Sequence, residues 1–279
     1  MPATPASTLL ENAQCFACLG MTIGEALALA EWDAISQAIS VDPVADFISR
    51  AGITDQTQID AVQALYDSAV ANGWWDKCDL IYPFVGGNAQ AHAQNLKSSN
   101  FTITWFGAVT HDANGITGDG ATGYGDTGYI PSSSGQVTLN SVHLSRFRRS
   151  IGNDGSYNCG GIDATSSLFI SKSVTTFITG AANSPFTNQR NTSALTLSAI
   201  VRNDAVDQHF FNDIDTSAAI ASTGIPTVSI QILCLNNAGV PSLFTTANLS
   251  SVTLGTGISF IEFTAMKADW VAFNTAIGR

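Results

Sequence analysis

Charged residues are scarce in this chain: they make up 12% of its 279 positions, about half of the ~25% found in an average soluble domain. Basic residues are the scarcer sign, with 11 Lys and Arg against 22 Asp and Glu and a net charge of −11. Nucleic-acid binding depends on Lys and Arg that neutralise phosphates, so this balance predicts no nucleic-acid partner. Apolar residues reach 45%, which argues against disorder and favours a rigid β protein with a Ser-, Thr-, Asn- and Gly-rich surface.

Long hydrophobic runs are also missing. Glu25, Glu31 and Asp33 interrupt the most apolar stretch near the N-terminus, so we expect no membrane insertion. The opening "MPATPASTLL" lacks the basic start and the continuous apolar segment of a signal peptide. We therefore expect the chain to be synthesised and to fold in the cytoplasm.

The five cysteines are an odd number at wide spacings, which predicts no disulfide framework. Cys15-x-x-Cys18 has the spacing of a redox pair or of two metal ligands, but no second pair or nearby His completes a zinc site. Cys159, in "YNCGG", has no basic neighbour in sequence that would activate a thiolate. Buried structural thiols are the favoured interpretation. Docking or inter-subunit contact through Cys15, Phe16 and Cys18 is the alternative that stays open.

The pattern of the first 75 residues predicts helices. Thr22 and Glu25 form a capping box, and apolar residues then recur at helical spacing at Ile23, Leu27, Ala34, Ile35 and Ile39. A second helix is expected in "TQIDAVQALYDSAV", with an apolar face formed by Ile59, Val62, Tyr66 and Val70. Because short helices are marginally stable alone, we expect residues 1–75 to be a small helical docking or oligomerisation segment.

From residue 76 onward the apolar pattern takes the two-residue period of β-strands. "FTITWFGAV", "SALTLSAIV" and "TVSIQILCL" alternate in this way, and Asn-Gly, Asp-Gly and Pro turns separate such runs. Many short strands without intervening helices predict an antiparallel jelly-roll β-sandwich over residues 76–279. Ser259 and Glu262 form a second capping box before an apolar stripe, so we expect a C-terminal helix at about 259–277.

Gly118-x-Gly120-x-x-Gly123 has the spacing of a dinucleotide-binding loop. Such a loop needs a following helix whose N-terminus receives the pyrophosphate, whereas "YGDTGYIPSSSG" cannot propagate a helix. Two tight turns with positive φ explain the glycines better, with Tyr124 and Tyr129 anchoring the strand between them. We therefore predict no nucleotide cofactor.

Three stretches of the sequence carry a resemblance to a known group. "YPFVGGNAQAHAQNLK…FTITWFGAVTHDANGITGDGATGYGDTGYIP" resembles the opening of a laminin-G-like, concanavalin-type jelly roll found in bacteriophage virion proteins. "LCLNNAGVPSLFTTANLSSVTLGTGISF…FNTAIGR" resembles the end of that domain, and "LLENAQCFACLGMTIGEALALAEWDAISQAI" resembles a helical segment at the front of phage virion proteins. The chain departs from the group at 201–215, where "VRNDAVDQHFFNDID" replaces the usual Lys-Asn-Gly hairpin. The resemblance implies a place on the virion.

The same fold also carries glycan hydrolases and lyases. Glycoside hydrolysis needs two carboxyl groups roughly 5 to 10 Å apart, yet Glu262 is the only glutamate beyond residue 75 and the helix cap already explains it. The aspartate pairs Asp204–Asp207 and Asp213–Asp215 are typical of turns. The histidines are isolated and no Gly-x-Ser-x-Gly elbow exists. We predict that the protein is not an enzyme, with a polysaccharide depolymerase on this fold as the alternative.

Two kinds of ligand remain for the predicted sandwich. Calcium is the metal we would expect at a rim of a laminin-G-like sandwich, with oxygen ligands available from Asp112, Asn114, Asp213 and Asp215. Solvated loop tips are the competing interpretation of these four residues. For a glycan, the candidates are aromatic residues in irregular polar segments, namely Tyr157, Phe210 and Phe211, with core packing as the competing interpretation.

These observations predict a phage virion structural protein, displayed as a capsid decoration, a neck or baseplate appendage, or a fibre head. Its expected partners are other virion proteins, further copies of itself in a dimer or trimer, and a bacterial surface glycan. The predicted location is the virion.

Overall fold

The computed structural model describes residues 42–153, 155–172, 176–183, 187–190 and 195–279. Residues 46–279 form one compact unit, and the β-sandwich belongs to it. Cys15, Phe16, Cys18 and the helix predicted after Thr22 lie outside the described residues. The helix at 56–71 therefore belongs to the same compact unit as the sandwich, while the docking role assigned to residues 1–75 stays a prediction.

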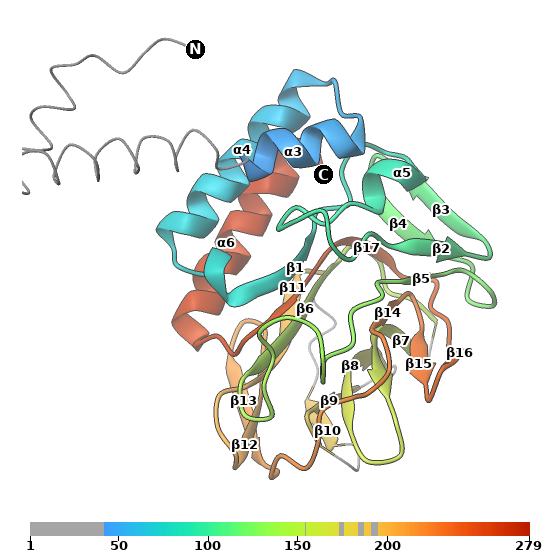
Figure 1. Ribbon diagram of the computed structural model, residues 1–279, viewed down its shortest axis with the longest axis vertical. Helices are drawn as coiled ribbons and strands as arrows, with labels where there is room; N and C mark the ends of the chain where they lie inside the picture. Colours follow the sequence, from blue (N-terminus) through green and yellow to red (C-terminus); the bar gives the residue numbers. More distant parts are fainter. Residues whose placement is uncertain (1–41, 154, 173–175, 184–186, 191–194) are drawn as a thin grey trace, which may run out of the picture. The chain divides into compact units, whose positions relative to one another are not determined.

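Two β-sheets pack face to face (Figure 1). Sheet A has the strand order β13-β12-β11-β6-β17-β4-β3, with β1 also paired to β17. Its strands are β1 (Cys78–Tyr82), β3 (Val109–Asp112), β4 (Gly115–Gly118), β6 (Val142–Arg148), β11 (Leu197–Arg202), β12 (Asp207–Phe211), β13 (Asp215–Ala219) and β17 (Asn248–Gly255).

Sheet B has the order β10-β9-β8-β7-β14-β5-β2, and β15 pairs with both β7 and β16. Its strands are β2 (Thr104–Phe106), β5 (Tyr124–Asp126), β7 (Ser156–Ile162), β8 (Ser167–Lys172), β9 (Thr176–Ala181), β10 (Thr187–Arg190), β14 (Gln231–Ile232), β15 (Leu235–Asn237) and β16 (Val240–Ser242). The described pairings are antiparallel except for β15 with β7. The fold is the predicted antiparallel jelly-roll β-sandwich, preceded by helices and ending in one.

The core lies between the two sheets and follows the two-residue period of the strands. Leu144, Ile200 and Leu254 project inward from sheet A, and Leu168 and Ile170 project inward from sheet B. The opposite face of sheet A is covered by helix α6 (Phe260–Ala276), since Thr253 on β17 contacts the Met266 sulfur. Both faces of sheet A are therefore covered at its centre, which explains why every residue of β6 is buried.

Helix α6 begins at the predicted capping box. The Glu262 amide donates to Ser259 Oγ (3.2 Å) and the Ser259 amide donates to Glu262 Oε2 (2.7 Å). The predicted apolar stripe is buried at Phe263, Met266, Trp270 and Phe273, and Gly278 follows with a φ of 75°. The capping box stabilises the start of the helix and Gly278 its end, while the buried stripe packs its length against the sheet. The predicted helix is confirmed to within a residue at each end.

Helix α4 (Gln56–Ala71) lies beside α6 (Figure 1). Its buried face is Ala61, Val62, Leu65 and Ala69, whereas Val70 is exposed. The apolar face predicted for this helix was therefore wrong by part of a turn, because small alanines rather than the larger Val70 lie against α6. Asp269 of α6 accepts the Trp74 Nε1 proton at 2.7 Å, which joins the two helices beyond the end of α4.

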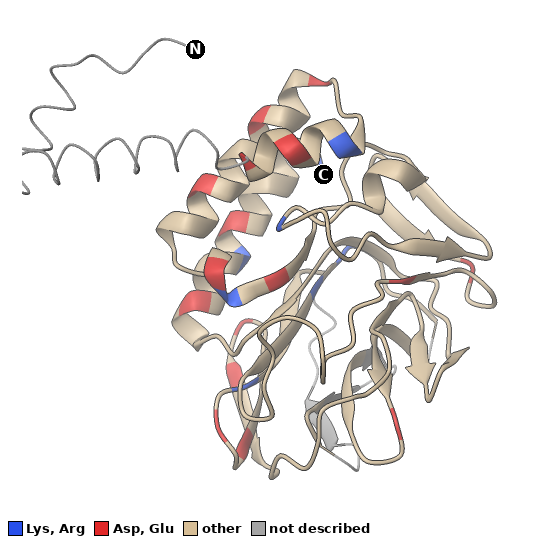
Figure 2. Cartoon of the chain, viewed as in Figure 1, with Lys and Arg blue, Asp and Glu red and all other residues tan. Residues whose placement is uncertain are grey.

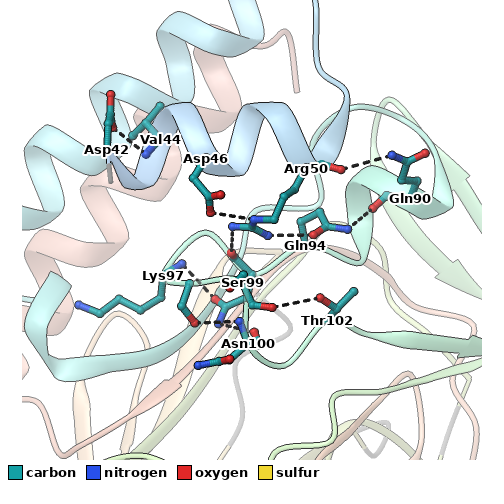
Figure 3. A network of polar contacts seen from close by, with 12 residues as sticks. Asp42, Val44, Asp46, Arg50, Gln90, Gln94, Lys97, Ser99, Asn100 and Thr102 are labelled. Atoms are coloured by element: carbon teal, nitrogen blue, oxygen red, sulfur yellow. Dashed lines mark hydrogen bonds and ion pairs between the residues drawn. The ribbon is translucent and has the colours of Figure 1, made fainter. Parts of the chain in front are cut away.

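Helix α3 (Pro43–Ala51) is joined to the sandwich by Arg50 (Figure 3). Its guanidinium pairs with Asp46, and donates to Gln94 Oε1 (2.8 Å) and to the Asn95 carbonyl (3.0 Å). Gln94 and Asn95 follow the short helix α5 (Ala89–His92). A one-turn 3-10 helix, η1 (Trp75–Lys77), leads into β1. No described helix is long and apolar enough to cross a membrane.

One predicted strand, "TVSIQILCL", is wrong. The chain breaks it into β14 and β15, because Leu233 has a φ of 68°, a left-handed conformation outside the β region. The Leu233 amide instead donates to the Asn158 carbonyl, and its own carbonyl accepts from the Thr245 amide. Turns flank β5 as predicted, with positive φ at Gly120 and Gly128. The prediction of positive φ is wrong for Gly118 and Gly123, which are glycines because a Cβ there would meet the carbonyl oxygens of Thr245 and Ala108.

Candidate functional site

Three aromatic rings lie together at the edge of sheet B. Phe106 of β2 and Tyr124 of β5 are directly opposite each other in the antiparallel register, and their rings stack at 4.8 Å with 13° between the planes. The Phe244 ring follows at 6.1 Å from Tyr124. Phe106 is 43% exposed although it is a large apolar residue. We call these three residues the aromatic platform.

Glycines allow the backbone to approach closely around the platform. A Cβ on Gly107 would lie 2.1 Å from the Thr122 carbonyl oxygen, and a Cβ on Gly123 would lie 2.1 Å from the Ala108 carbonyl oxygen. Only glycine fits at such distances. The segment after β2 is thereby packed directly against the segment before β5, which holds the Phe106 and Tyr124 rings in register.

Asp119 organises the loop that precedes Tyr124. Its Oδ1 accepts from the amides of Ala121, Thr122 and Gly123, and its Oδ2 accepts from the Thr122 hydroxyl at 2.7 Å. These bonds, led by those from Thr122, hold the Asp119 pKa well below its usual range. Asp119 is consequently an ionised acceptor that shapes the loop.

Two further segments meet this loop beside Phe244. Asn153 Oδ1 accepts from the Thr246 amide (2.8 Å), and Asn153 Nδ2 donates to the Phe244 carbonyl (3.1 Å). Gly120 lies close to Thr246 and Asn153, since a Cβ there would lie 2.7 Å from Thr246 Cγ2 and 3.7 Å from Asn153 Nδ2. Three polar loops, 118–123, 152–153 and 244–246, therefore converge next to the platform.

The platform residues differ in polarity. Burial raises the pKa of Tyr124 above its ordinary value, so its phenol stays protonated and can both donate and accept a hydrogen bond. In the described part of the chain its hydroxyl has no hydrogen-bond partner. The site thus offers apolar ring faces with a phenol, an amide, a hydroxyl and a carboxylate around them.

The aromatic residues predicted from sequence lie elsewhere. Phe210 and Phe211 are fully or almost fully buried, and Tyr157 is 8% exposed. Phe211 packs against Phe260 and Phe263 of α6. None of the three presents an exposed ring, so their prediction as glycan-contacting residues is corrected to the competing one, core packing.

The predicted calcium ligands are engaged in other contacts. Asp112 Oδ1 accepts the Asn114 amide at 2.7 Å in a local turn. Asp213 pairs with Lys267 Nζ at 2.5 Å, and Asp215 lies 2.9 Å from His209 Nδ1. Within the described ranges no three His, Cys, Asp or Glu residues gather as a metal site, and the rim calcium stays a prediction.

The described cysteines are structural. Cys78, Cys159 and Cys234 are buried free thiols. Burial raises the pKa of Cys159 to about 12, so it is not a thiolate at neutral pH. Cys15, Phe16 and Cys18 are outside the described residues.

Sequence reasoning missed the platform, although one signal was present. In "FTITWFGAV" the alternation places Phe106 on the face opposite to Phe101, Ile103 and Trp105, which is the side expected to be exposed. A large aromatic on that face needs an explanation. Its pairing with Tyr124 depends on strand register and could not be derived from either segment alone.

No family model matches this sequence, and no curated protein matches it. Among solved structures, domain 4 of AbnA, a GH43 extracellular arabinanase from Geobacillus stearothermophilus in complex with arabinotriose, is 14% identical, with a TM-score of 0.49 over 68% of this chain and 98% of that domain. The binding domain of Paraclostridial Mosquitocidal Protein 1 is 10% identical, with a TM-score of 0.46 over 72% of this chain and 52% of that one. The NanB sialidase from Streptococcus pneumoniae is 12% identical, with a TM-score of 0.37 over 45% of this chain, which spans 23% of the sialidase.

Proposed function

We propose that this protein is a glycan-attachment module of a bacteriophage particle, and that the aromatic platform contacts the glycan. The observation that carries the proposal is the stacked, solvent-facing pair Phe106–Tyr124, extended by Phe244, at the point where three polar loops converge. Exposed rings beside fixed polar groups are the chemistry that a sugar surface requires, because sugar rings have apolar C–H faces and polar edges.

The groups around the rings are held in place before any ligand arrives. The bonds of Asn153 to Thr246 and Phe244, and those of Asp119 within its loop, fix the three segments. The Tyr124 hydroxyl and the second proton of Asn153 Nδ2 then remain to bond sugar hydroxyls. The Thr246 hydroxyl accepts from the Asn153 backbone amide and donates to Asn153 Oδ1, so it belongs to the framework that fixes the loops. A rigid site of this kind loses little conformational entropy on binding.

We propose attachment without cleavage. Asp119, in the loop before Tyr124, is ionised and accepts four hydrogen bonds, whereas a glycosidic general acid must be protonated at working pH. Asp126, two residues after Tyr124, accepts from the Gly128 amide, the Ser229 hydroxyl and Gln231 Nε2, which are structural contacts within the sandwich. The depolymerase alternative has no group in this site that favours it.

The virion part of the proposal is supported by the order of phage-like motifs along the sequence. Mass spectrometry of purified particles should identify the protein among the structural components. Its absence from the particles would refute the virion role and leave the glycan-binding role to be judged separately.

Binding of the full chain to host cells and to their extracted surface polysaccharide tests the platform. We expect saturable binding of the wild type with unchanged polymer length. Phe106→Ala, Tyr124→Ala and Phe244→Ala should each weaken binding about 3- to 10-fold, because one aromatic contact contributes about 0.5–1.5 kcal/mol.

Tyr66→Ala is the matched control, since Tyr66 also forms a partly exposed aromatic pair, with Trp75, but lies on α4. Equal affinity for all four variants would refute the platform as the glycan site. Shortening of the polymer during incubation would refute attachment without cleavage and restore the depolymerase.

A further inference from the structure

A pocket lies on the face of sheet A that helix α6 covers, where the last turns of α6 meet the ends of β6 and β11. Its volume is about 260 Å³, and its lining residues are Phe147, Arg149, Leu195, Val271, Asn274, Thr275 and Arg279. None of them belongs to the aromatic platform. The volume lies just below the range for drug-sized ligands, so the pocket suits a single small ring.

Two arginines and no acidic residue line this pocket, in a chain whose net charge is −11. Arg279 is fixed by neutral oxygens, because its Nε donates to the Ala113 carbonyl (2.6 Å) and its Nη2 to the Phe84 carbonyl (2.6 Å). Carbonyls position the guanidinium without cancelling its charge. Within the part of the chain that the structure describes, the Arg149 side chain has no hydrogen-bond or ion-pair partner.

The two guanidinium charges act on each other. Burial, and after it the charge of Arg149, lowers the pKa of Arg279 to about 10, although the Asp112 carboxylate, which does not line the pocket, acts in the opposite direction. Like charges that repel across a partly dry pocket are relieved when an anion binds between them. The pocket therefore favours a negatively charged ligand.

Asn274 adds a requirement for a hydrogen-bond donor on the ligand. The residue is only 5% exposed, and its Nδ2 donates to the Trp270 carbonyl at 2.8 Å. Its Oδ1 faces no donor among the described residues. A buried acceptor without a partner is unfavourable by about 1–3 kcal/mol, and a ligand hydroxyl would remove that penalty.

The remaining walls are apolar or partly polar. Phe147 closes one side, and Val271 and Leu195 are half exposed at the mouth. The Thr275 hydroxyl donates to the Val271 carbonyl, which leaves its lone pairs free to accept. The pocket thus combines a cationic donor, two acceptors and an apolar wall.

We propose that this pocket binds a small hydroxylated carboxylate, and specifically an acidic sugar ring of the hexuronate type. The carboxylate pairs with Arg149 beside Arg279, a ring hydroxyl donates to Asn274 Oδ1, and the C–H face of the ring lies on Phe147. A neutral sugar lacks the charge, and acetate lacks the hydroxyl and the ring. The site is independent of the platform, since the two share no residue.

Isothermal titration of the full chain with sodium D-glucuronate, D-glucose and sodium acetate tests this proposal. We expect glucuronate to bind at concentrations up to about 10 mM, with glucose and acetate each weaker by at least about tenfold. Arg149→Gln should weaken glucuronate binding by at least about tenfold without lowering the melting temperature, because Arg149 has no partner to lose within the described chain and the variant removes its repulsion with Arg279. Arg149→Lys should retain part of the affinity.

Two controls separate this site from general charge effects and from the platform. Lys267→Gln also removes one positive charge, but from a residue of α6 that does not line the pocket, and it should leave glucuronate binding unchanged. Phe106→Ala, which alters only the platform, should leave it unchanged as well. Absence of glucuronate binding would overturn the proposal. Equal binding of glucose or acetate, or wild-type affinity in Arg149→Gln, would overturn it as well.

Discussion

His143 is held as a neutral imidazole beneath helix α6. Its Nδ1 lies 2.5 Å from the Thr256 carbonyl, to which it donates, so Nε2 accepts from the Thr253 hydroxyl at 3.2 Å. Thr253 in turn accepts from Ser145 at 2.6 Å. A second proton on Nε2 would face the Thr253 hydroxyl and would place an uncompensated charge in the interior. Burial accordingly lowers the pKa of His143 to about 4.

This arrangement predicts a loss of stability in mild acid. Below the ordinary histidine pKa of 6.5 the unfolded chain takes up protons that folded His143 and His92, with pKa values of about 4 and about 3, do not bind. The free energy of unfolding should therefore fall between about pH 6.5 and pH 4, by up to about 1.4 kcal/mol per pH unit for each histidine. Urea unfolding at pH 7, 6 and 5 measures the slope.

His143→Gln should lower stability at pH 7 and make the slope between pH 6.5 and 5 shallower by one proton. That interval lies above the range in which carboxylates titrate, so it reports on histidines. An unchanged slope in His143→Gln would contradict the assignment of a neutral, buried imidazole.

Burial of single residues was the hardest property to infer from the sequence. Phe210 and Phe211 are adjacent on β12, so an isolated strand would expose one of them. Both are buried because one face of the strand lies against the sandwich and the other lies under Phe260 and Phe263. The pattern of β12 alone does not show that a helix 50 residues later covers its outer face.

At the scale of elements, glycines decide how the strands that carry the platform approach each other. Gly123 does not have positive φ, so its role is close approach to Ala108. Gly128 has a φ of 66° and an open space where a Cβ would lie, so its role is conformational. The two residues flank β5, so substituting each one tests close approach and positive φ separately.

We predict that Gly123→Ala destabilises the fold by about 1–3 kcal/mol and also weakens glycan binding, because the segments on either side of the platform must move apart. Gly128→Ala should lower stability by about 1–2 kcal/mol through backbone strain alone and leave glycan binding unchanged. Urea unfolding and polysaccharide binding on both variants provide the measurements. Wild-type glycan affinity in Gly123→Ala would show that close approach at this position does not hold the platform.

Elements with strong local signals were predictable. The capping box at Ser259 and the apolar stripe after it gave α6 to within a residue, since both depend on residues three or four positions apart. The alternating strands indicated a sandwich because their two-residue period is also a local signal. The break at Leu233 and the Phe106–Tyr124 pair depend on contacts between distant segments, and no local pattern determines them.

At the scale of the whole molecule, charged residues of either sign are sparse, and most residues of the described helices and strands are uncharged (Figure 2). Acidic residues lie on helices α4 and α6 and also on the strands and loops of the sandwich. Screening by salt weakens interactions between exposed charges and barely affects contacts between rings and sugars. The two proposed sites should consequently respond differently to ionic strength, with glucuronate binding at Arg149 falling as salt rises and platform binding holding constant.

The apolar pattern of the N-terminal segment predicts self-association of the full chain. Residues 22–41 carry a predicted helical face of Ile23, Leu27 and Ile35 in the sequence, and attachment through weak glycan contacts gains avidity when several copies act together. Light scattering during size-exclusion chromatography should give two or three times the 29.2 kDa mass of one chain at micromolar concentration. Leu27→Asp should shift the protein toward one chain, because it places a charge on the predicted face, whereas Ser36→Asp, off that face, should not. A wild-type mass of 29.2 kDa would contradict self-association and would confine any avidity to copies arranged by other components of the particle.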